Sequence, residues 1–260
     1  MRGRLLSSGK RPVAAVSIMK KSQAFSCQPA PVCVIALPMP GIFCSSRVTQ
    51  GLHGGPETTW ERLRQLLPDS RIVCLKQIHS DVIARAEDIS EGDFPEADGV
   101  ISCDPSVVLC VRTADCVPVL MWADDAPVIA AVHAGWRGLA LKIVPKAVQC
   151  MVASGARRIH VSMGPAIGPC CYAVGREVIE ALRTEPDRHL DGRLFVDLHR
   201  VLRNQVIETG IASENVHQVK ACTCCSGSSY YSYRRDGEFT GRNVSAIGGK
   251  ACSLPGLPVP

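Results

Sequence analysis

The middle of the chain alternates short apolar runs with turn-forming residues, and this pattern restricts the fold more than any other feature. The runs are rich in Val and Ile and are separated by Asp, Pro and Ala; they cover residues 99–102, 107–111, 117–122 and 127–132. Apolar runs this short and this rich in β-branched residues are typical of buried strands. The sequence therefore predicts a sheet at the centre of the protein.

Segments with helical character flank these strands. Helices are expected over residues 60–67, 139–153 and 176–183, and from Asp197 as N-cap to residue 208; further strands are expected over residues 72–75, 82–86, 158–163 and 216–221. Pro145 falls inside the second helix, which therefore either starts near Val144 or is kinked. Strands in the middle with helices around them predict a layered α+β fold with mixed sheets.

The first part of the chain differs in charge from the rest. Every charged residue before Glu57 is basic. An acid-free start that contains Arg and Ser predicts a poorly ordered N-terminal extension over residues 1–40, followed by one folded domain over residues 41–260. No apolar run reaches the ~18 residues of a membrane-spanning helix, so no membrane partner is expected. Aromatic residues are only 5% and the basic residues are scattered, so no nucleic-acid partner is expected either.

Fourteen cysteines are spread over the 260 residues. Several lie inside apolar runs, where a thiol behaves as a small apolar group. Since no secretory signal is recognised, a reduced, cytoplasmic setting is expected instead of a disulfide scaffold. Cys222 and Cys225 form one C-x-x-C pair, and Cys170 and Cys171 are adjacent in a Gly/Pro-rich loop. No second C-x-x-C lies at zinc-ribbon spacing, so a structural metal at Cys222 and Cys225 is only a minor alternative.

Reactive side chains follow three of the predicted strands. His79 lies in K-Q-I-H-S, Cys116 ends T-A-D-C, and His133 begins H-A-G-W-R-G. Loops at strand ends are where a rigid scaffold presents working groups. Each residue alone also fits a plainer role, as a hydrogen-bonded histidine or a buried, inert thiol. The separations of 37 and 17 residues form no compact metal motif, so spacing alone leaves both interpretations open.

Seven motifs occur in one order along the chain: K-Q-I-H-S, T-A-D-C-V-P-V, H-A-G-W-R-G, G-P-A-I-G-P-C-C-Y-A-V-G, F-V-D-L, A-C-T and Y-S-Y-R-R-D-G-x-x-T-G-R. Their order resembles the laccase-domain family, whose members are also called purine nucleoside phosphorylase or polyphenol oxidase family proteins. The resemblance covers residues 42–248. It implies a single-domain α-β-β-α layered sandwich with mixed sheets, similar to cytotoxic necrotising factor-like hydrolases.

The resemblance also implies a zinc ion held by His79, Cys116 and His133. Two imidazoles and a thiolate leave the fourth tetrahedral position for water or substrate, and zinc lowers the pKa of a bound water towards ~7. The implied activities are phosphorolysis of adenosine, inosine, guanosine and methylthioadenosine, and deamination of adenosine. The expected partners are therefore a small-molecule nucleoside and phosphate, while the sequence does not indicate the oligomeric state.

A site that handles phosphate needs guanidinium groups, whose geometry matches phosphate oxygens. Arg137, four residues after His133, and Arg62 are the sequence candidates. Two positions depart from the family pattern: Thr49 and Glu61 each stand where the family has Asn. These departures leave the expected zinc ligands intact and concern substrate positioning.

Three alternatives stay open at this point. A copper-dependent phenol oxidase is one, because copper outranks zinc in intrinsic affinity; against it, the seven histidines form no His-x-His pair. A metal-free hydrolase of peptidoglycan precursors is another, with Cys116 as nucleophile and His79 or His133 as base. The third is a non-enzymatic scaffold that keeps the zinc site for stability.

Overall fold

The larger of the two main sheets carries most of the apolar runs. The computed structural model describes residues 33–36, 42–46, 56–68 and 70–248 of the chain. The sheet has six strands in the order β13-β9-β7-β8-β5-β4. The β4/β5 and β9/β13 pairs are parallel and the others antiparallel, so the sheet is mixed, as predicted. The strands are β4 Ile83–Arg85, β5 Gly99–Ser102, β7 Val117–Ala123, β8 Ile129–Ala134, β9 Ile159–Met163 and β13 Val216–Gln218.

The second main sheet has five strands in the order β1-β2-β14-β6-β3. Only β3 and β6 are parallel. The strands are β1 Cys33–Ala36, β2 Ile42–Ser46, β3 Ile72–Val73, β6 Val108–Thr113 and β14 Asn243–Gly248. Strand β1 lies within the expected extension and pairs with β2. A third, small sheet consists of β10 Ala173–Val174, β12 Arg193–Phe195 and β11 Arg188–Leu190.

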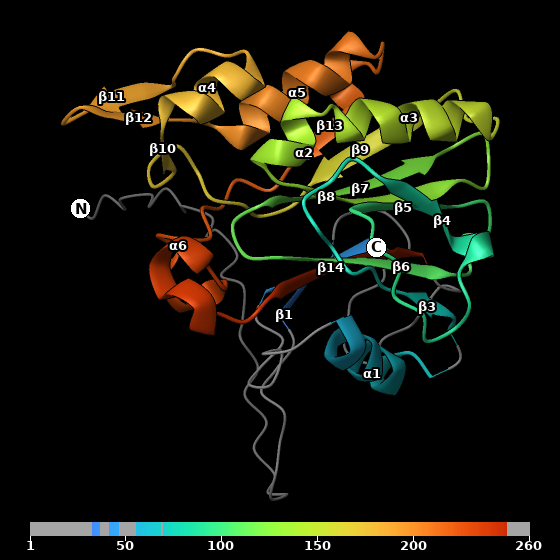
Figure 1. Cartoon of the computed structure of the whole chain (residues 1–260). Helices are drawn as coiled ribbons and strands as arrows, with labels where there is room; N and C mark the ends of the chain where they lie inside the picture. Colours follow the sequence, from blue (N-terminus) through green and yellow to red (C-terminus); the bar gives the residue numbers. More distant parts are fainter. Residues whose placement is uncertain (1–32, 37–41, 47–55, 69, 249–260) are drawn as a thin grey trace, which may run out of the picture.

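The helices lie on the outer faces of the two main sheets. Helices α2 to α5 cover the six-stranded sheet, and α1 lies beyond the five-stranded sheet (Figure 1). The helices are α1 Pro56–Leu66, α2 Trp136–Ala140, α3 Ile143–Ala153, α4 Arg176–Leu182, α5 Leu198–Glu208 and the short α6 Tyr233–Asp236; the 3₁₀ turns are η1 Ala86–Asp88, η2 Ser213–Asn215, η3 Gly227–Ser229 and η4 Gly237–Phe239. In the described ranges, no helix has the length and apolar character needed to cross a membrane.

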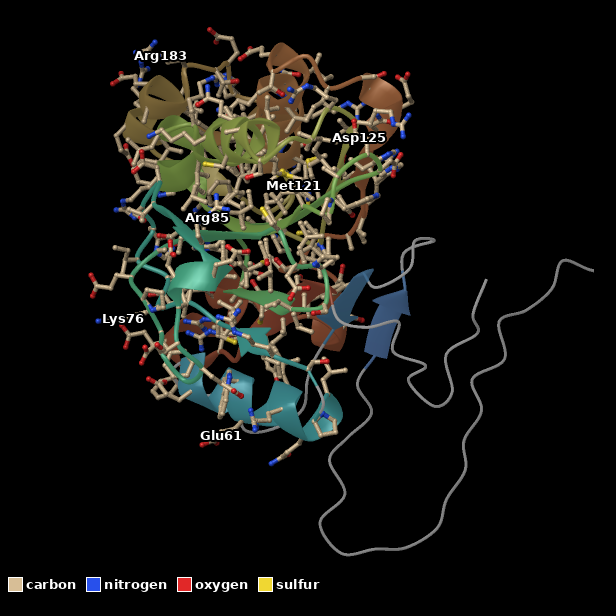
Figure 2. The ribbon with its side chains drawn as sticks, turned by 90° about the vertical axis from the view of Figure 1, so that its right-hand side faces the viewer. Glu61, Lys76, Arg85, Met121, Asp125 and Arg183 are labelled. Carbon is tan, nitrogen blue, oxygen red and sulfur yellow. The ribbon has the colours of Figure 1, made fainter. Side chains whose placement is uncertain are left out.

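The molecule has four layers: helices α2 to α5, the six-stranded sheet, the five-stranded sheet and α1. Three apolar clusters lie between them. The first contains Met121 of β7 and Leu139 of α2, and it fills the space under helices α2 to α5. Figure 2 shows Met121 in the interior, whereas Glu61 lies on the outer side of α1. The second cluster lies between the two main sheets, and the third joins α1 to the five-stranded sheet. Burial of apolar surface between successive layers thus produces the α-β-β-α order.

Two helix starts follow directly from single residues. The segment expected as one helix over residues 139–153 is two helices, because Lys142 adopts a left-handed conformation with φ 61°. Helix α3 begins after it, which leaves Pro145 in the first turn, where a missing N–H costs nothing. At α5, the Asp197 side chain accepts from the N–H groups of His199 and Arg200, as predicted for an N-cap.

Candidate metal centre

The structure brings His79, Cys116 and His133 together where the two main sheets meet. His79 lies in the loop between β3 and β4, Cys116 in the turn between β6 and β7, and His133 in β8. Their ligand atoms all lie within 4.8 Å of one another, and Cys116 Sγ is 4.0 Å from His79 Nε2. His79 is exposed, Cys116 is half-buried and His133 is buried. Residues far apart in the sequence therefore form one cluster that is open to solvent on one side.

Asp98 holds two of these three residues in place. Its buried carboxylate accepts from His133 Nδ1 at 2.8 Å and from the backbone N–H of His79 at 3.0 Å. Ser80 adds donations from its N–H and its hydroxyl at 2.6 and 2.7 Å. Burial opposes ionisation of Asp98, but the bonds from His133 and Ser80 outweigh it and lower the pKa of the carboxyl to about 2. An ionised carboxylate only accepts, so Nδ1 of His133 carries a proton, and Nε2 can bind a metal ion once its own proton has been displaced.

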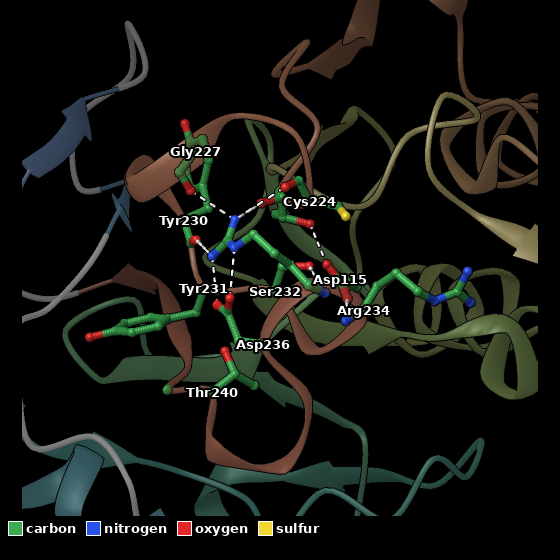
Figure 3. A network of polar contacts seen from close by, with 12 residues as sticks. Asp115, Cys224, Gly227, Tyr230, Tyr231, Ser232, Arg234, Asp236 and Thr240 are labelled. Carbon is green, nitrogen blue, oxygen red and sulfur yellow. Dashed lines mark hydrogen bonds and ion pairs between the residues drawn. The ribbon is translucent and has the colours of Figure 1, made fainter.

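The turn that carries Cys116 is held by its neighbour Asp115. Asp115 adopts φ 93°, a conformation that costs a residue with a side chain about 1–3 kcal/mol. Its carboxylate accepts from the Thr223 hydroxyl at 2.6 Å and from the Arg234 N–H at 2.7 Å (Figure 3). These bonds connect the Cys116 turn to α6 and to the loop that precedes it, and they offset the strained backbone.

The charges of the cluster favour a thiolate next to a protonated imidazole. Burial opposes ionisation of Cys116, but the charges of His133 and His79 and their hydrogen bonds outweigh it and lower the pKa of the thiol to about 6. Burial likewise opposes protonation of His133, but Cys116 and Asp98 raise the pKa of His133 to about 9. Cys116 is therefore ready to act as a thiolate ligand or nucleophile near neutral pH.

The donor set fits a transition-metal ion. In a tetrahedral zinc site, two imidazole nitrogens and a sulfur lie roughly 3.3–3.7 Å apart, so these side chains need only small movements to share one ion. Gly135 provides room beside them, because a Cβ there would lie 3.0 Å from Cys116 Sγ and 3.2 Å from His79 Cδ2. Asp98 supplies the carboxylate–histidine bond that commonly accompanies a bound metal.

The cluster opens into a cavity of about 360 Å³. Arginines and tyrosines line it as well as the three cluster residues: Arg112, Arg234, Arg242, Tyr172 and Tyr233. Arg112 is fixed through its backbone, which exchanges hydrogen bonds with the Gln77 amide at 2.7 and 2.9 Å. Burial and the positive charge of Arg242 lower the pKa of Arg112, whereas negative groups oppose this. Arg112 and Arg242 thus line the same cavity as the cluster, and the charge of Arg242 disfavours the charged form of Arg112.

Neither of the two arginines expected from the sequence is seen in the cavity: Arg137 lies outside it, and the side chain of Arg62 is not among the described ones. Arg137 is exposed, stacks on the ring of Trp136 at 4.5 Å and does not line the cavity. The backbone of Arg62 lies in α1, but its side chain and the whole of Thr49 fall outside the described residues. Both arginines stay predictions as phosphate-binding residues.

Sequence reasoning missed most of the residues around the cluster. Tyr172, Tyr233, Arg234 and Arg242 all lie within motifs that carry the family resemblance, in C-C-Y-A-V-G and Y-S-Y-R-R-D-G-x-x-T-G-R. These two motifs were therefore the sequence feature from which the four cavity residues could have been predicted. Asp98 had a weaker signal, as an acidic residue directly before a buried strand.

Fold and cluster together define a mixed α/β protein of four layers with a two-histidine, one-cysteine candidate metal site. Residues 57–250 match the family model described as multi-copper polyphenol oxidoreductase laccase, and the chain belongs to this family. Among the described residues, only one group able to hold a metal contains histidine.

Curated relatives of this chain carry two kinds of name. The chain is 33% identical to purine nucleoside phosphorylase YlmD of Geobacillus stearothermophilus over 227 residues, which cover 77% of this chain and 83% of the relative. It is 32% identical to adenosine deaminase RL5 of an unknown prokaryotic organism, over 68% of this chain and 74% of the relative.

The crystal structure of YlmD from Geobacillus stearothermophilus has a similar fold. It matches this structure with a TM-score of 0.71 at 28% identity, over 86% of this chain and 98% of that one. The mixed sheets expected from the sequence are thus confirmed, whereas the likeness to cytotoxic necrotising factor-like hydrolases stays a prediction.

Proposed function

We propose that this protein is a zinc-dependent purine nucleoside phosphorylase that also deaminates adenosine. The names of the curated relatives support both activities. The observation that carries the proposal is one cavity that is lined both by the His79, Cys116 and His133 cluster and by three arginines. Adenosine, inosine, guanosine and methylthioadenosine are the proposed nucleosides.

The cluster residues are the proposed zinc ligands. Nε2 of His133, the Cys116 thiolate and the His79 imidazole supply three donors, which leaves one position for substrate or water. A bound zinc ion supplies Lewis-acid polarisation of an oxygen or nitrogen of the substrate. The protein's own contribution is to keep His133 in one tautomer through Asp98 and to keep Cys116 ionised.

Arg112 and Arg242 are the proposed phosphate-binding residues. Both line the cavity, and their positive charges interact. A phosphate dianion bound in the cavity would be attracted by both charges. Arg242 is anchored by donations from one guanidinium nitrogen to the carbonyls of Thr240 and Gly241, both at 3.0 Å. Arg62 and Arg137 are proposed as further contributors from the sequence alone.

Tyr172 offers the purine an aromatic face and a donor. Arg234 lies over its ring at 5.3 Å and fixes the ring from one side. Burial, together with the charges of Cys116 and Asp115, raises the pKa of Tyr172 to about 12, so the phenol keeps its proton. In phosphorolysis, the C1′–N9 bond breaks, a phosphate oxygen bonds to C1′, and the departing purine takes a proton. The protonated Tyr172 phenol can donate a hydrogen bond to the departing base, while the raised pKa disfavours transfer of its own proton.

The test measures base release from inosine and adenosine with and without phosphate, together with the metal content of the protein. We expect phosphate-dependent release of hypoxanthine by the zinc-loaded protein, and phosphate-independent conversion of adenosine to inosine. Cys116→Ala should lower both rates at least 100-fold, whereas Cys103→Ala, a half-buried cysteine outside the cavity, should not. Zinc-loaded protein that performs neither reaction contradicts the proposal, and copper-dependent phenol oxidation would replace it.

A metal-free cysteine hydrolase is the second candidate, and one geometric observation favours it. Asp98 binds Nδ1 of His133 at 2.8 Å, and a ring nitrogen of His133 lies within 4.8 Å of the Cys116 sulfur. A carboxylate, an imidazole and a thiol in this order activate nucleophiles on unrelated folds. Alkylation separates the two candidates. A zinc-bound Cys116 stays unmodified by iodoacetamide until a chelator is added, whereas a free thiolate reacts at once and the chelator changes nothing.

A further inference from the structure

Four cysteines that the proposed reaction does not use form a second cluster. Cys170 and Cys171 come from the loop before β10, and Cys222 and Cys225 from the loop after β13. All four sulfur atoms lie within 4.8 Å of one another, and Cys170 Sγ is 3.5 Å from Cys225 Sγ. The two pairs are about 50 residues apart in the sequence, and Cys170 and Cys171 are adjacent, so they do not form a second C-x-x-C pair.

Backbone contacts hold the two loops next to each other. Ala166 and Cys222 form an isolated β-bridge, and the Thr223 N–H donates to the Ala166 carbonyl at 3.0 Å. The Gly168 N–H donates to Cys222 Sγ at 3.2 Å. A Cβ on Gly168 would lie 3.3 Å from Cys170 Sγ, so glycine lets this loop approach two of the sulfurs closely. The geometry of the cluster is therefore fixed by its surroundings.

The size of the cluster matches a tetrahedral tetrathiolate site. With zinc–sulfur bonds of about 2.3 Å, the four sulfurs of such a site lie roughly 3.8 Å apart. Separations of up to 4.8 Å thus require movements of no more than about 1 Å. The cluster contains sulfur donors alone, and soft thiolates in tetrahedral geometry select zinc or iron–sulfur centres over hard cations.

Guanidinium groups lie close to this cluster. Arg188 donates to the Cys170 carbonyl at 3.2 Å, Arg234 to the Cys171 carbonyl at 3.3 Å, and Arg235 to the Cys224 carbonyl at 3.2 Å. Arg235 also donates to the carbonyls of Gly227 and Tyr230 and pairs with Asp236, which orders this loop (Figure 3). A divalent ion with four thiolates carries two net negative charges, which nearby guanidinium groups offset.

We propose that Cys170, Cys171, Cys222 and Cys225 bind a second, structural zinc ion. Four protein ligands leave no open position, so the ion stabilises the loops and does not take part in chemistry. The first loop continues into Tyr172, and the second is joined to the cavity through the bond from Thr223 to Asp115. The ion would therefore hold one wall of the catalytic cavity in place.

The test counts zinc ions per chain in the full-length protein, purified under reducing conditions and equilibrated with zinc alone. Wild type should bind two, Cys116→Ala one, and the double variant Cys170→Ser/Cys225→Ser one. Cys224→Ser, a neighbouring cysteine outside the cluster, should still bind two. If the His79 centre binds no zinc, wild type and the double variant each lose one ion from their count, so the difference of one ion between them still tests the four-cysteine site.

Alkylation of the wild type covers the case in which the double variant does not fold. The four cluster cysteines should resist iodoacetamide and become reactive after a strong chelator is added, whereas the half-buried Cys103 should react equally in both conditions. The proposal is overturned if wild type and the double variant bind the same number of ions, if the four thiols react freely without a chelator, or if the purified protein holds a Cys170–Cys225 disulfide.

Discussion

Asp98 shows how one buried residue organises two ligands from different parts of the chain. Its carboxylate accepts one hydrogen bond from Nδ1 of His133 in β8 and three from residues 79 and 80 of a separate loop. An unpaired buried carboxylate is costly, so the folded state requires all of these donors at once. Burial of the Asp98 carboxylate therefore depends on the hydrogen bonds that also place His79 and His133.

Replacement of Asp98 by Asn tests this arrangement. The amide keeps the size of the side chain but loses the charge that fixes the His133 tautomer, so we expect zinc affinity to fall about 10–100-fold. Competition with a chromogenic chelator measures the affinity. Asp93→Asn, an exposed acidic residue in the loop before Asp98, is the matched control and should leave it unchanged. Equal affinities of the two variants would contradict this role of Asp98.

Arg242 provides a second test at the scale of the residue. Arg242→Ala removes one of the two guanidinium groups proposed to bind phosphate, so we expect the KM for phosphate to rise about 10-fold, with a smaller effect on the KM for inosine. The same phosphate titration applies to Arg62→Ala and Arg137→Ala. A KM for phosphate that is unchanged in Arg242→Ala removes this residue from the phosphate site.

At the scale of the element, the small sheet is attached to α5 by one ion pair. Asp187, directly before β11, receives two bonds from the Arg200 guanidinium at 2.6 and 2.9 Å and one from the Asp197 N–H at 2.8 Å. Burial raises the pKa of Asp187, but the bonds from Arg200 and Asp197 outweigh it, and the net pKa is lowered. The same carboxylate thus connects the β11–β12 hairpin to the start of a helix of the main core.

The lowered pKa of Asp187 gives this connection a defined pH dependence. A carboxyl with a lower pKa in the folded state contributes stability above its unfolded pKa of about 3.9, and this contribution is lost as the pH falls below it. We expect Asp187→Asn to destabilise the protein by about 1 kcal/mol at pH 7, since Arg200 is partly exposed, and by less at pH 3.

Urea unfolding at the two pH values measures this difference for Asp187→Asn. Asp191→Asn in the same hairpin is the control, because Asp191 is exposed and Asn tolerates its left-handed backbone. A stability difference of the same size at pH 3 and pH 7 would show that the carboxylate charge is not involved.

The elements with the clearest local signals were predictable from the sequence. The expected strand over residues 99–102 is β5, and Asp197 caps α5 as its side chain suggests. Pairing between distant segments was not predictable, because β14 and β6 come together through packing and carry no local signal of it. The same limit explains the candidate sites: motifs identified His79, Cys116 and His133, whereas Cys170 and Cys225 meet only in three dimensions.

At the scale of the whole molecule, the apolar layer under helices α2 to α5 is the largest contributor to burial. Met121 lies at its centre with no exposed surface. We expect Met121→Ala to destabilise the protein by about 2–5 kcal/mol, because removal of a buried side chain loses its transfer free energy and leaves a cavity. Val152→Ala on the outer side of α3, where the side chain is 43% exposed, should cost less than about 1 kcal/mol. Guanidinium unfolding of both variants measures the difference, and a cost below 1 kcal/mol for Met121→Ala would contradict this account of the core.

The position of β14 has a consequence for how the protein is made. This strand comes last among the described elements but lies inside the five-stranded sheet, between β2 and β6. During translation, β6 therefore lacks one of its neighbouring strands until residue 248 has left the ribosome. The turn after β6 carries Cys116. Contacts between such distant segments form late in folding. A nascent or C-terminally truncated chain thus contains all three ligands of the candidate metal centre but lacks the strand that joins β2 to β6 in the five-stranded sheet.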